Sequence, residues 1–184
     1  MEQHQHIYPV ENARGLDSRV RKWLQNPARM LKGRVREGMV VLELGCGPGF
    51  FTTEIARRVG KSGKVIAADL QEGMLELVRK KLAATDLESR VLLHKCDVDR
   101  IGVTEKVDLV VAFFMVHEVA DKSRMLKELK AILKPGGSLY IVEFRMRPPK
   151  KIFADMVKIA NEAGFVEKEE WASLLSRAVV LAAG

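Results

Sequence analysis

The sequence predicts a doubly wound α/β fold, and two observations support that prediction. Short apolar segments alternate with helical patterns along most of the chain, and one of them, residues 40–44, runs directly into closely spaced glycines. Apolar strands that alternate with helices form a parallel sheet that helices cover on both faces. A glycine turn between a strand and a helix places a ligand at the carboxyl end of the strand. With 184 residues, 47% of them hydrophobic, the chain can form one domain with a substantial core.

The expected strands and helices follow from the apolar periodicity of the sequence. Strands are predicted over residues 39–44, 64–69, 91–95, 107–113 and 138–144. Helices are predicted over residues 50–59, 72–84, 121–133 and 151–163. The segment Pro135-Gly136-Gly137 should end the fourth of these helices and turn the chain into the fifth strand. Two shorter strands are expected after the last helix, over residues 165–171 and 177–182.

Residues 1–37 precede this pattern, and we assign them to an N-terminal arm and helix. Residues 1–16 are polar, and residues 17–36 carry a helical periodicity that is interrupted at Asn26 and Pro27. Asparagine suits an N-cap and proline suits a first helical position. Because no long insertion follows the fifth expected strand, a lid would come from this arm, a partner subunit or the substrate. We favour the arm as a candidate lid, with residues 38–184 as the ligand-binding domain.

The glycine loop after the first strand could bind either of two kinds of ligand, a dinucleotide or a cation without phosphates. Its glycines are Gly45, Gly47 and Gly49, whereas a dinucleotide site has the spacing G-x-G-x-x-G and would need glycine where Phe50 stands. Glu43 lies two residues before the first glycine. A carboxylate there would repel a pyrophosphate and attract an ammonium or sulfonium cation. The loop therefore favours a cationic ligand without phosphates over a dinucleotide.

A second carboxylate ends the next expected strand. Asp69 closes the apolar segment 64–69 and falls 20 residues after Gly49. An acid at this place in a strand–helix–strand unit accepts hydrogen bonds from ribose hydroxyls. Asp69 could instead serve only as a helix N-cap or turn residue, because Gly73 and a helical pattern follow it. We favour the ribose interpretation, so the ligand should carry a nucleoside as well as a cation.

These features together resemble the class I S-adenosylmethionine-dependent methyltransferases, of the small-molecule type that includes the ubiquinone/menaquinone-biosynthesis-like enzymes. The resemblance covers roughly residues 38–144. The segments that carry it occur in the family's order, at residues 41–49, 69, 96–97, 107–111 and 133–139. The resemblance implies a Rossmann-like, doubly wound fold whose seven-stranded sheet is mostly parallel and has its last strand antiparallel.

The resemblance also implies which residues bind the cofactor, S-adenosylmethionine, which leaves as S-adenosylhomocysteine. Glu43 and the glycine loop would hold the methionine part, Asp69 the ribose and Asp97 the adenine amine. Leu70 would pack on the adenine face. Cys46, a small residue in the loop, is expected to pack there and not to act as a nucleophile. The full set implied is Glu43, Gly45, Cys46, Gly47, Gly49, Asp69, Leu70, Cys96, Asp97, Val98 and Phe113.

Methyl transfer from a sulfonium is an in-line displacement on an activated methyl group. The protein has mainly to align the nucleophile, methyl and sulfur and to exclude water. The end of the fourth expected strand, residues 112–119, is the place to look for acceptor chemistry. It departs from the Asn/Asp-Pro-Pro-aromatic motif that enzymes methylating nucleobase amines carry there. Phe113, Phe114 and Met115 instead suggest an apolar wall, which favours a small-molecule acceptor.

A general base is needed only if the acceptor is a weak acid. His117 is the candidate catalytic residue, because an unperturbed imidazole can accept a proton near neutral pH. It could instead be a polar cap residue before the next helix, which is the more ordinary role for a histidine there. Glu118 and Glu143 are alternatives, and Glu143 could simply bind the substrate or pair with Arg145. His94 falls within a strand and is expected to be structural.

The chain is basic, with a formal net charge of +7 and an isoelectric point near 9.5. That charge permits an anionic partner without establishing one. A methyltransferase acting on RNA or protein is therefore the first alternative to a small-molecule enzyme. The second is a cofactor-binding partner subunit without activity of its own. Most basic residues fall on helix faces that solvent should cover, but residues 19–36 and 145–151 hold denser groups.

Composition also bears on the compartment. The two cysteines, Cys46 and Cys96, are too few for a disulfide framework, which favours a reducing, cytoplasmic setting. No apolar run approaches the length of a membrane span or forms the core of a signal peptide. Neither the cysteines nor the histidines have metal-ligand spacing, so no metal is expected. The oligomeric state and the methyl acceptor are not evident from the sequence.

Overall fold

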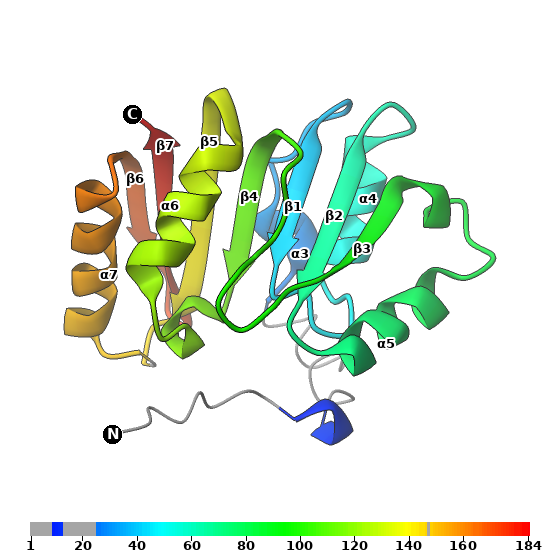
Figure 1. Cartoon of the computed structure of the whole chain (residues 1–184), viewed down its shortest axis with the longest axis horizontal. Helices are drawn as coiled ribbons and strands as arrows, with labels where there is room; N and C mark the ends of the chain where they lie inside the picture. Colours follow the sequence, from blue (N-terminus) through cyan, green and yellow to red (C-terminus); the bar gives the residue numbers. More distant parts are fainter. Residues whose placement is uncertain (1–8, 13–24, 147) are drawn as a thin grey trace. The chain divides into compact units, whose positions relative to one another are not determined.

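The computed structural model describes residues 9–12, 25–146 and 148–184 (Figure 1). Its contacts divide the chain into two compact units, residues 8–98 and residues 99–184, which are described separately. Within the described part of the chain, the longest helix has 13 residues and none could cross a bilayer. The helical pattern expected over residues 17–24 and most of the arm lie outside the described residues. The proposed lid therefore stays a prediction.

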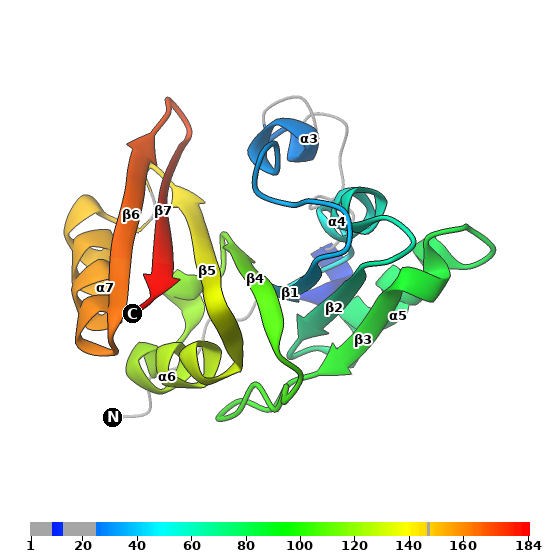
Figure 2. The ribbon, with the colours of Figure 1, turned by 90° about the horizontal axis from the view of Figure 1, so that it is seen from above.

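The first unit is built on three parallel strands, β1 (Val40–Leu44), β2 (Lys64–Asp69) and β3 (Val91–Lys95). Helix α4 (Thr52–Val59) packs against β1 and β2, and α5 (Glu72–Leu82) packs against β2 and β3. Both crossovers run in the same direction across the strands, so right-handed connections place both helices on one face (Figure 2). The short helices are η1 (Val10–Asn12), α3 (Pro27–Met30) and η2 (Glu88–Arg90).

The second unit continues with β4 (Val107–Phe113) and β5 (Leu133–Phe144), which pair in parallel. β7 (Ser176–Ala183) pairs antiparallel with β5 and with β6 (Phe165–Ala172). Helices α6 (Lys122–Ile132) and α7 (Lys150–Glu162) pack against each other over this part of the sheet (Figure 1). A single 3-10 turn, η3 (Val116–Glu118), follows β4.

The strand order of the sheet is β3-β2-β1-β4-β5-β7-β6, with β7 antiparallel to its neighbours. The predicted seven-stranded, doubly wound fold is therefore confirmed. The strands form because their residues are apolar on both faces: the side chains of Val41, Val65, Val110 and Leu139 are all fully buried. Helix α4 illustrates the helical period, because its buried residues fall at positions 52, 55, 56 and 59.

One local feature matches the predictions, the cap of α3, and another departs from them, the turn expected before β5. Asn26 caps α3, since its side chain accepts a hydrogen bond from the backbone N–H of Arg29, and Pro27 is the first helical residue. The predicted turn at residues 135–137 is wrong, because α6 ends at Ile132 and β5 begins at Leu133. The glycine-rich segment is an irregularity inside β5. Gly136 has a φ of +78°, and the β4–β5 register shifts between Val107 and Leu109.

The edge strand β6 is strongly charged. Residues Glu167, Lys168, Glu169 and Glu170 are all exposed. Charged side chains along an edge strand discourage pairing with the edge of another sheet. This edge is therefore poorly suited to joining two copies of the chain.

Candidate functional site

The loop after β1 has a backbone that only glycine adopts readily. Gly45, Gly47 and Gly49 have φ values of +71°, +52° and +76°. Residues with a Cβ are strained in this region, which explains the glycine at every second position. Gly49 is also tightly packed, because a Cβ added there would lie 3.2 Å from Cγ2 of Val78 on α5. The chain therefore turns sharply away from the strand and enters α4 close to a neighbouring helix.

The carboxyl end of β2 holds this loop in place. The backbone N–H groups of Gly45 and Cys46 donate to the carbonyl of Ala68 at 2.8 and 3.0 Å. Oδ2 of Asp69 accepts the N–H of Gly47 at 2.9 Å, and its Oδ1 accepts the N–H of Gln71, also at 2.9 Å. Asp69 thus links the glycine loop to the turn that begins α5. Asp69 therefore serves as a turn residue, the alternative considered from the sequence, and also contacts the glycine loop.

Asp69 is 8% exposed, and burial raises the pKa of its carboxyl group above the usual value. The N–H groups of Gln71 and Gly47 act in the opposite direction, because they stabilise the charged form. A carboxylate has roughly four acceptor positions, and the backbone groups of Gln71, Gly47 and Leu70 use three of them. Asp69 can therefore accept a further hydrogen bond from a ligand, such as one from a ribose hydroxyl.

Glu43 lies beside this loop as a buried acid, with 3% of its surface exposed. Its Oε2 accepts a hydrogen bond of 2.6 Å from the hydroxyl of Thr52, the first residue of α4. Thr52 itself is fully buried. Thr52 was not among the residues singled out from the sequence. It lies one turn after the glycines, but its contact with Glu43 is apparent only once α4 is packed against β1.

The remaining residues expected around the cofactor lie at the ends of β2 and β3. The N–H of Cys96 donates to the carbonyl of Asp69 at 2.9 Å, which ties the two strand ends together. Leu70 is half-buried, whereas Asp97 and Val98 are exposed. Burial raises the pKa of the Cys46 thiol well above its ordinary value, so this cysteine stays protonated. The thiol is therefore suited to packing and not to nucleophilic attack. The adenine contacts assigned to this region remain predictions.

In the second unit, the segment after β4 brings together two residues that the sequence left as alternatives. Nδ1 of His117 lies 2.9 Å from Oε2 of Glu143, and the backbone N–H of His117 donates to Oε1 at 3.0 Å. The Glu143 side chain is 2% exposed and that of His117 is 20% exposed. A carboxylate only accepts hydrogen bonds, so Nδ1 carries the shared proton. Nε2 is then the nitrogen with a lone pair.

The backbone around this pair is also unusual. Phe114 has a φ of +60°, which is rare for a bulky residue, and its N–H donates to the carbonyl of Val142 on β5 at 2.7 Å. Such conformations concentrate at functional sites. Phe114 stacks on Phe144 with a centroid distance of 4.3 Å, and Phe113 contacts Tyr140 edge to face. Phe113 and Phe114 are 7% and 8% exposed, so both rings are buried by these contacts, and the apolar wall expected around the acceptor stays a prediction.

Lys122, on the first turn of α6, adds a cation to this neighbourhood. Burial lowers the pKa of its amino group, and the nearby charge of Glu143 opposes that effect. Its Nζ donates to the carbonyl of Val119 at 2.6 Å. Glu143 is therefore influenced by a cation as well as by the imidazole of His117. Arg145, the partner that the sequence suggested for Glu143, instead donates from its guanidinium to the carbonyl of Ser173 at 3.1 Å.

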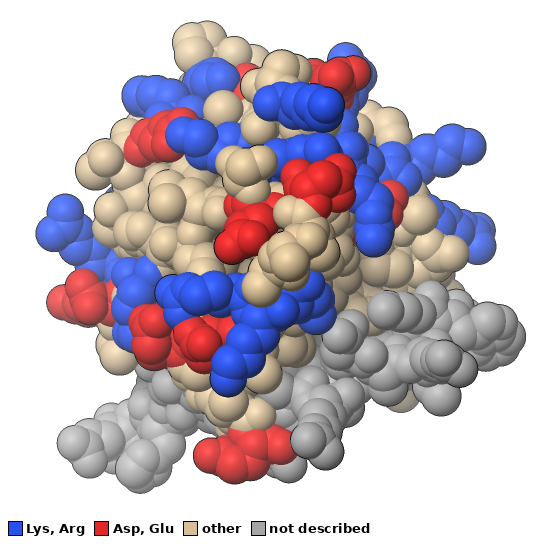
Figure 3. All heavy atoms as spheres, turned by 90° about the vertical axis from the view of Figure 1, so that its right-hand side faces the viewer, with Lys and Arg blue, Asp and Glu red and all other residues tan. Residues whose placement is uncertain are grey.

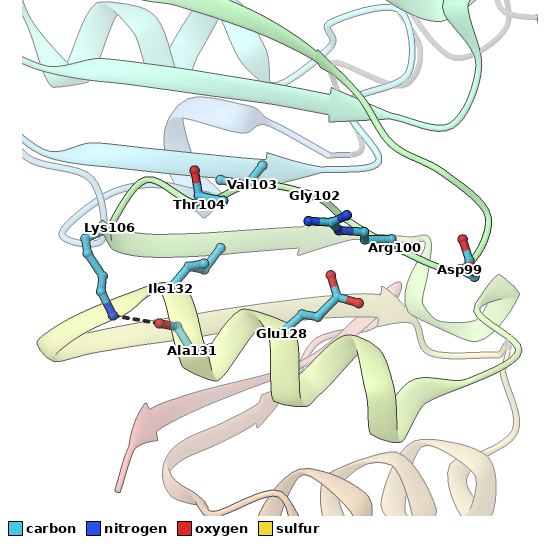
Figure 4. A pocket seen from close by; sticks show the side chains of 9 residues that line it. All are labelled: Asp99, Arg100, Gly102, Val103, Thr104, Lys106, Glu128, Ala131 and Ile132. Carbon is cyan, nitrogen blue, oxygen red and sulfur yellow. Dashed lines mark hydrogen bonds between the residues drawn. The ribbon is translucent and has the colours of Figure 1, made fainter.

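A separate open hollow of about 670 Å³ lies in the second unit, between residues 99–106 and α6 (Figure 4). Two of the charged side chains that line it, Lys106 and Glu128, contact the backbone. Nζ of Lys106 donates to the carbonyl of Ala131 at 2.7 Å, and Glu128 accepts the N–H of Ile101 at 2.9 Å. These contacts brace the segment before β4 against α6. We assign the hollow no chemistry.

The basic residues do not form one continuous positive surface on the face shown in Figure 3. Lysines and arginines there are interspersed with acidic residues. Several are paired within or beside helices: Arg79 contacts Glu76, and Arg90 lies 2.9 Å from Asp86. Such pairs are typical of a solvated surface. They do not favour a nucleic-acid interface on this face.

Comparison with known proteins defines the class. A family model described as a methyltransferase domain matches residues 41–137, and the chain belongs to that family. The chain is similar to the ubiquinone/menaquinone biosynthesis C-methyltransferase UbiE of Haemophilus ducreyi, with 33% identity over 132 residues, 71% of this chain and 49% of that protein. It is also 35% identical over 113 residues to the demethylmenaquinone methyltransferase of Lactobacillus johnsonii, covering 61% of this chain and 46% of that protein.

Among solved structures, the chain resembles a SAM-dependent methyltransferase from Aquifex aeolicus, with a TM-score of 0.88 and 26% identity. That match covers 97% of this chain and 100% of the other. The chain spans about half the length of the curated relatives it matches. The family resemblance seen in the sequence is therefore confirmed.

Proposed function

We propose that this protein is an S-adenosylmethionine-dependent methyltransferase acting on a small molecule. The observation that carries the proposal is the glycine loop tied to Asp69, with Glu43 buried beside it. The Aquifex aeolicus structure, described as a SAM-dependent methyltransferase, supports the choice of cofactor. The curated relatives are named as quinone-biosynthesis methyltransferases, which supports a small-molecule acceptor.

In this proposal the first unit binds the cofactor. Glu43 and the loop Gly45, Cys46, Gly47 and Gly49 hold the cationic methionine part, and Asp69 accepts the ribose hydroxyls. Leu70, Cys96, Asp97 and Val98 surround the adenine. The buried carboxylates favour a ligand with positive charge, because a sulfonium or ammonium group gains most from an acid that water does not screen.

The second unit supplies the chemistry of the acceptor. His117 acts as general base through Nε2, and Glu143 is the positioning residue that holds Nδ1–H and so sets the tautomer. S-adenosylmethionine, when bound, would supply the activated methyl group, and Nε2 of His117 would take the proton that the acceptor atom loses on methylation. A base of this kind typically contributes about 10²–10⁴-fold in rate. Its presence fits an acceptor whose reacting atom carries a proton.

Two other proposals belong with this one. The N-terminal arm closes over the site as a lid. The protein works in a reducing compartment, the cytoplasm, because two cysteines, Cys46 and Cys96, are too few for a disulfide framework. RNA or protein remains the alternative acceptor class. Basic residues paired with acids on the face in Figure 3 weigh against RNA. A partner subunit without activity would have little use for an oriented imidazole.

The experiment that tests the proposal uses S-adenosylmethionine labelled in its methyl group. The protein is incubated with cell extract, and the label is followed into small-molecule, lipid, RNA and protein fractions. Label in the small-molecule or lipid fraction is expected, and it yields a compound to identify. Label in RNA or protein only would replace the small-molecule proposal with the macromolecular one.

A further inference from the structure

The second unit exposes apolar side chains at the end of β5 and in the turn between β6 and β7. Four of them form what we call the hairpin patch: Phe144, Met146, Leu174 and Leu175. Met146 is 87% exposed, Leu174 84%, Leu175 41% and Phe144 39%. Figure 1 shows both segments at the same end of this unit. Single exposed leucines are ordinary, but a cluster of large apolar side chains indicates an interaction site.

The two segments are held together by hydrogen bonds. The N–H of Arg145 donates to the carbonyl of Leu175 at 2.8 Å, and the Arg145 guanidinium donates to the carbonyl of Ser173 at 3.1 Å. Arg177 donates from its guanidinium to the carbonyl of Arg145. The backbone that carries Met146 is therefore fixed beside the backbone that carries the leucines. The patch is one surface and not two unrelated loops.

The turn itself is tight. The hydroxyl oxygen of Ser173 accepts the N–H of Leu175 at 3.4 Å and that of Ser176 at 3.1 Å. The N–H of Ser173 donates to the carbonyl of Ser176 at 2.7 Å. These bonds close the turn at Ser173, Leu175 and Ser176, and the side chains of Leu174 and Leu175 are exposed beside it. A closed turn of this kind can present apolar side chains to the headgroup region of a bilayer, where water still solvates the backbone.

Basic residues flank the patch. Arg145 lies between Phe144 and Met146, and Lys150 and Lys151 begin α7 a few residues later; all three are exposed. Trp171, partly exposed, lies near the end of β6 on the other arm of the hairpin. Apolar tips with basic and aromatic residues at their margin are the composition that binds the surface of an anionic bilayer.

We propose that the hairpin patch docks this protein on anionic lipid bilayers, with Leu174, Leu175 and Met146 entering the headgroup region and the basic residues contacting the lipid phosphates. A second copy of the chain is a weaker occupant. A stable interface buries about 800 Å² per partner, more than four partly exposed side chains can supply. The inference does not depend on the methyl acceptor.

Flotation of the full chain with vesicles tests the proposal. Vesicles are made of phosphatidylcholine alone or of equal parts phosphatidylcholine and phosphatidylglycerol. The chain should bind the mixed vesicles and not the neutral ones, and added salt should weaken binding. The variant Leu174→Gln/Leu175→Gln should bind at least about tenfold more weakly. Lys150→Gln/Lys151→Gln should lose about fivefold for each charge removed.

The matched control is Leu92→Gln, since Leu92 is 50% exposed on β3 of the first unit and lies outside the patch. It should bind as the unchanged chain does. The proposal is overturned if the chain does not float with mixed vesicles, or if the double leucine variant floats equally well. Self-association that the leucine variant abolishes, without lipid binding, would assign the patch to a second copy instead.

Discussion

Both oxygens of the Glu143 carboxylate contact His117, one at the ring Nδ1 at 2.9 Å and the other at the backbone N–H at 3.0 Å. The carboxylate therefore fixes the position of the residue as well as the tautomer of its ring. His117 follows β4 and Glu143 lies near the end of β5, two strands that pair in parallel. Their carboxyl ends meet, which brings together residues 26 apart in the sequence.

This arrangement predicts a division of roles between the two residues. His117→Gln should lower kcat by about 10²–10⁴-fold with the identified acceptor, because the base is lost. Glu143→Gln should also lower kcat, because an amide has a single acceptor oxygen and cannot serve both N–H groups. Neither change should alter the affinity for S-adenosylmethionine. Steady-state kinetics across pH and direct cofactor binding measure these effects.

Glu118→Gln is the control for that pair, since Glu118 lies in the same turn and its nearest carboxylate oxygen is 3.9 Å from Nε2 of His117. It should keep most of the activity. If Glu143→Gln left both kcat and the pH profile unchanged, the positioning role would be wrong. A merely structural Glu143 would change stability without changing the pH profile.

Thr52 is predicted to stabilise the buried carboxylate of Glu43. Thr52→Val should lower the free energy of unfolding by about 1–3 kcal/mol, because it leaves a buried acceptor without its 2.6 Å partner. Thr52→Ser keeps the hydroxyl and should retain most of that stability. Chemical denaturation of the three proteins measures the difference. Equal losses for Val and Ser would show that packing, and not the hydrogen bond, makes this position sensitive.

Gly49 should tolerate substitution less well than another glycine of similar backbone conformation. Gly49→Ala faces both a φ of +76° and the side chain of Val78 at 3.2 Å, whereas Gly33→Ala faces a φ of +75° with nothing within 4 Å. Left-handed strain costs each variant about 1–2 kcal/mol, and Gly49→Ala should lose more. Val78→Ala in the Gly49→Ala background should recover the steric part only. Similar losses at both glycines would remove the packing argument.

The burial of Asp69 predicts a pH dependence of stability. Its pKa is raised in the folded state, so the folded protein keeps the proton at pH values where the unfolded chain has lost it. The unfolded carboxyl titrates near 3.8. The contribution of Asp69 is therefore full below that pH and is lost as pH rises through the folded pKa.

Comparison with Asp69→Asn isolates this effect, because asparagine does not titrate. The stability of the unchanged protein, relative to the variant, should fall as pH rises from below 3.8 toward neutrality. Thermal unfolding of both proteins over that range measures the difference. A constant difference across pH would mean that the folded carboxyl titrates like the unfolded one.

The fold and the glycine loop with its two acids could be predicted because each depends on a pattern of residues that are close in the sequence. The strands at residues 64–69, 91–95 and 107–113 have the expected bounds, since each is an apolar run closed by a polar or glycine-rich turn. Glu43 and Asp69 stand at the ends of such runs, and the topology of the fold brings strand ends together. The three glycines had positive φ values, as a tight turn requires.

The side-chain contacts of the candidate site could not be predicted, because they depend on how strands and helices pack against one another. The pairing of His117 with Glu143 requires knowing which residues of β4 and β5 lie side by side, and Thr52 becomes visible only when α4 is placed against β1. The glycines at positions 136 and 137 looked like an interelement turn, yet they lie within β5. A pair of glycines indicates that the backbone can adopt unusual conformations. Both a turn and an irregularity within a strand use such conformations, so the sequence does not distinguish them.

The most direct test of the central claim is a titration of S-adenosylmethionine into the unchanged protein, Asp69→Asn and Glu72→Gln, followed by calorimetry. Glu72 is an exposed acid three residues from Asp69, at the start of α5, and serves as the control. We predict saturable binding to the unchanged protein and the control. Asp69→Asn should lose about 1.5–3 kcal/mol of binding free energy, the value of a hydrogen bond to a charged group. No saturable binding, or equal affinity in Asp69→Asn, would contradict the account.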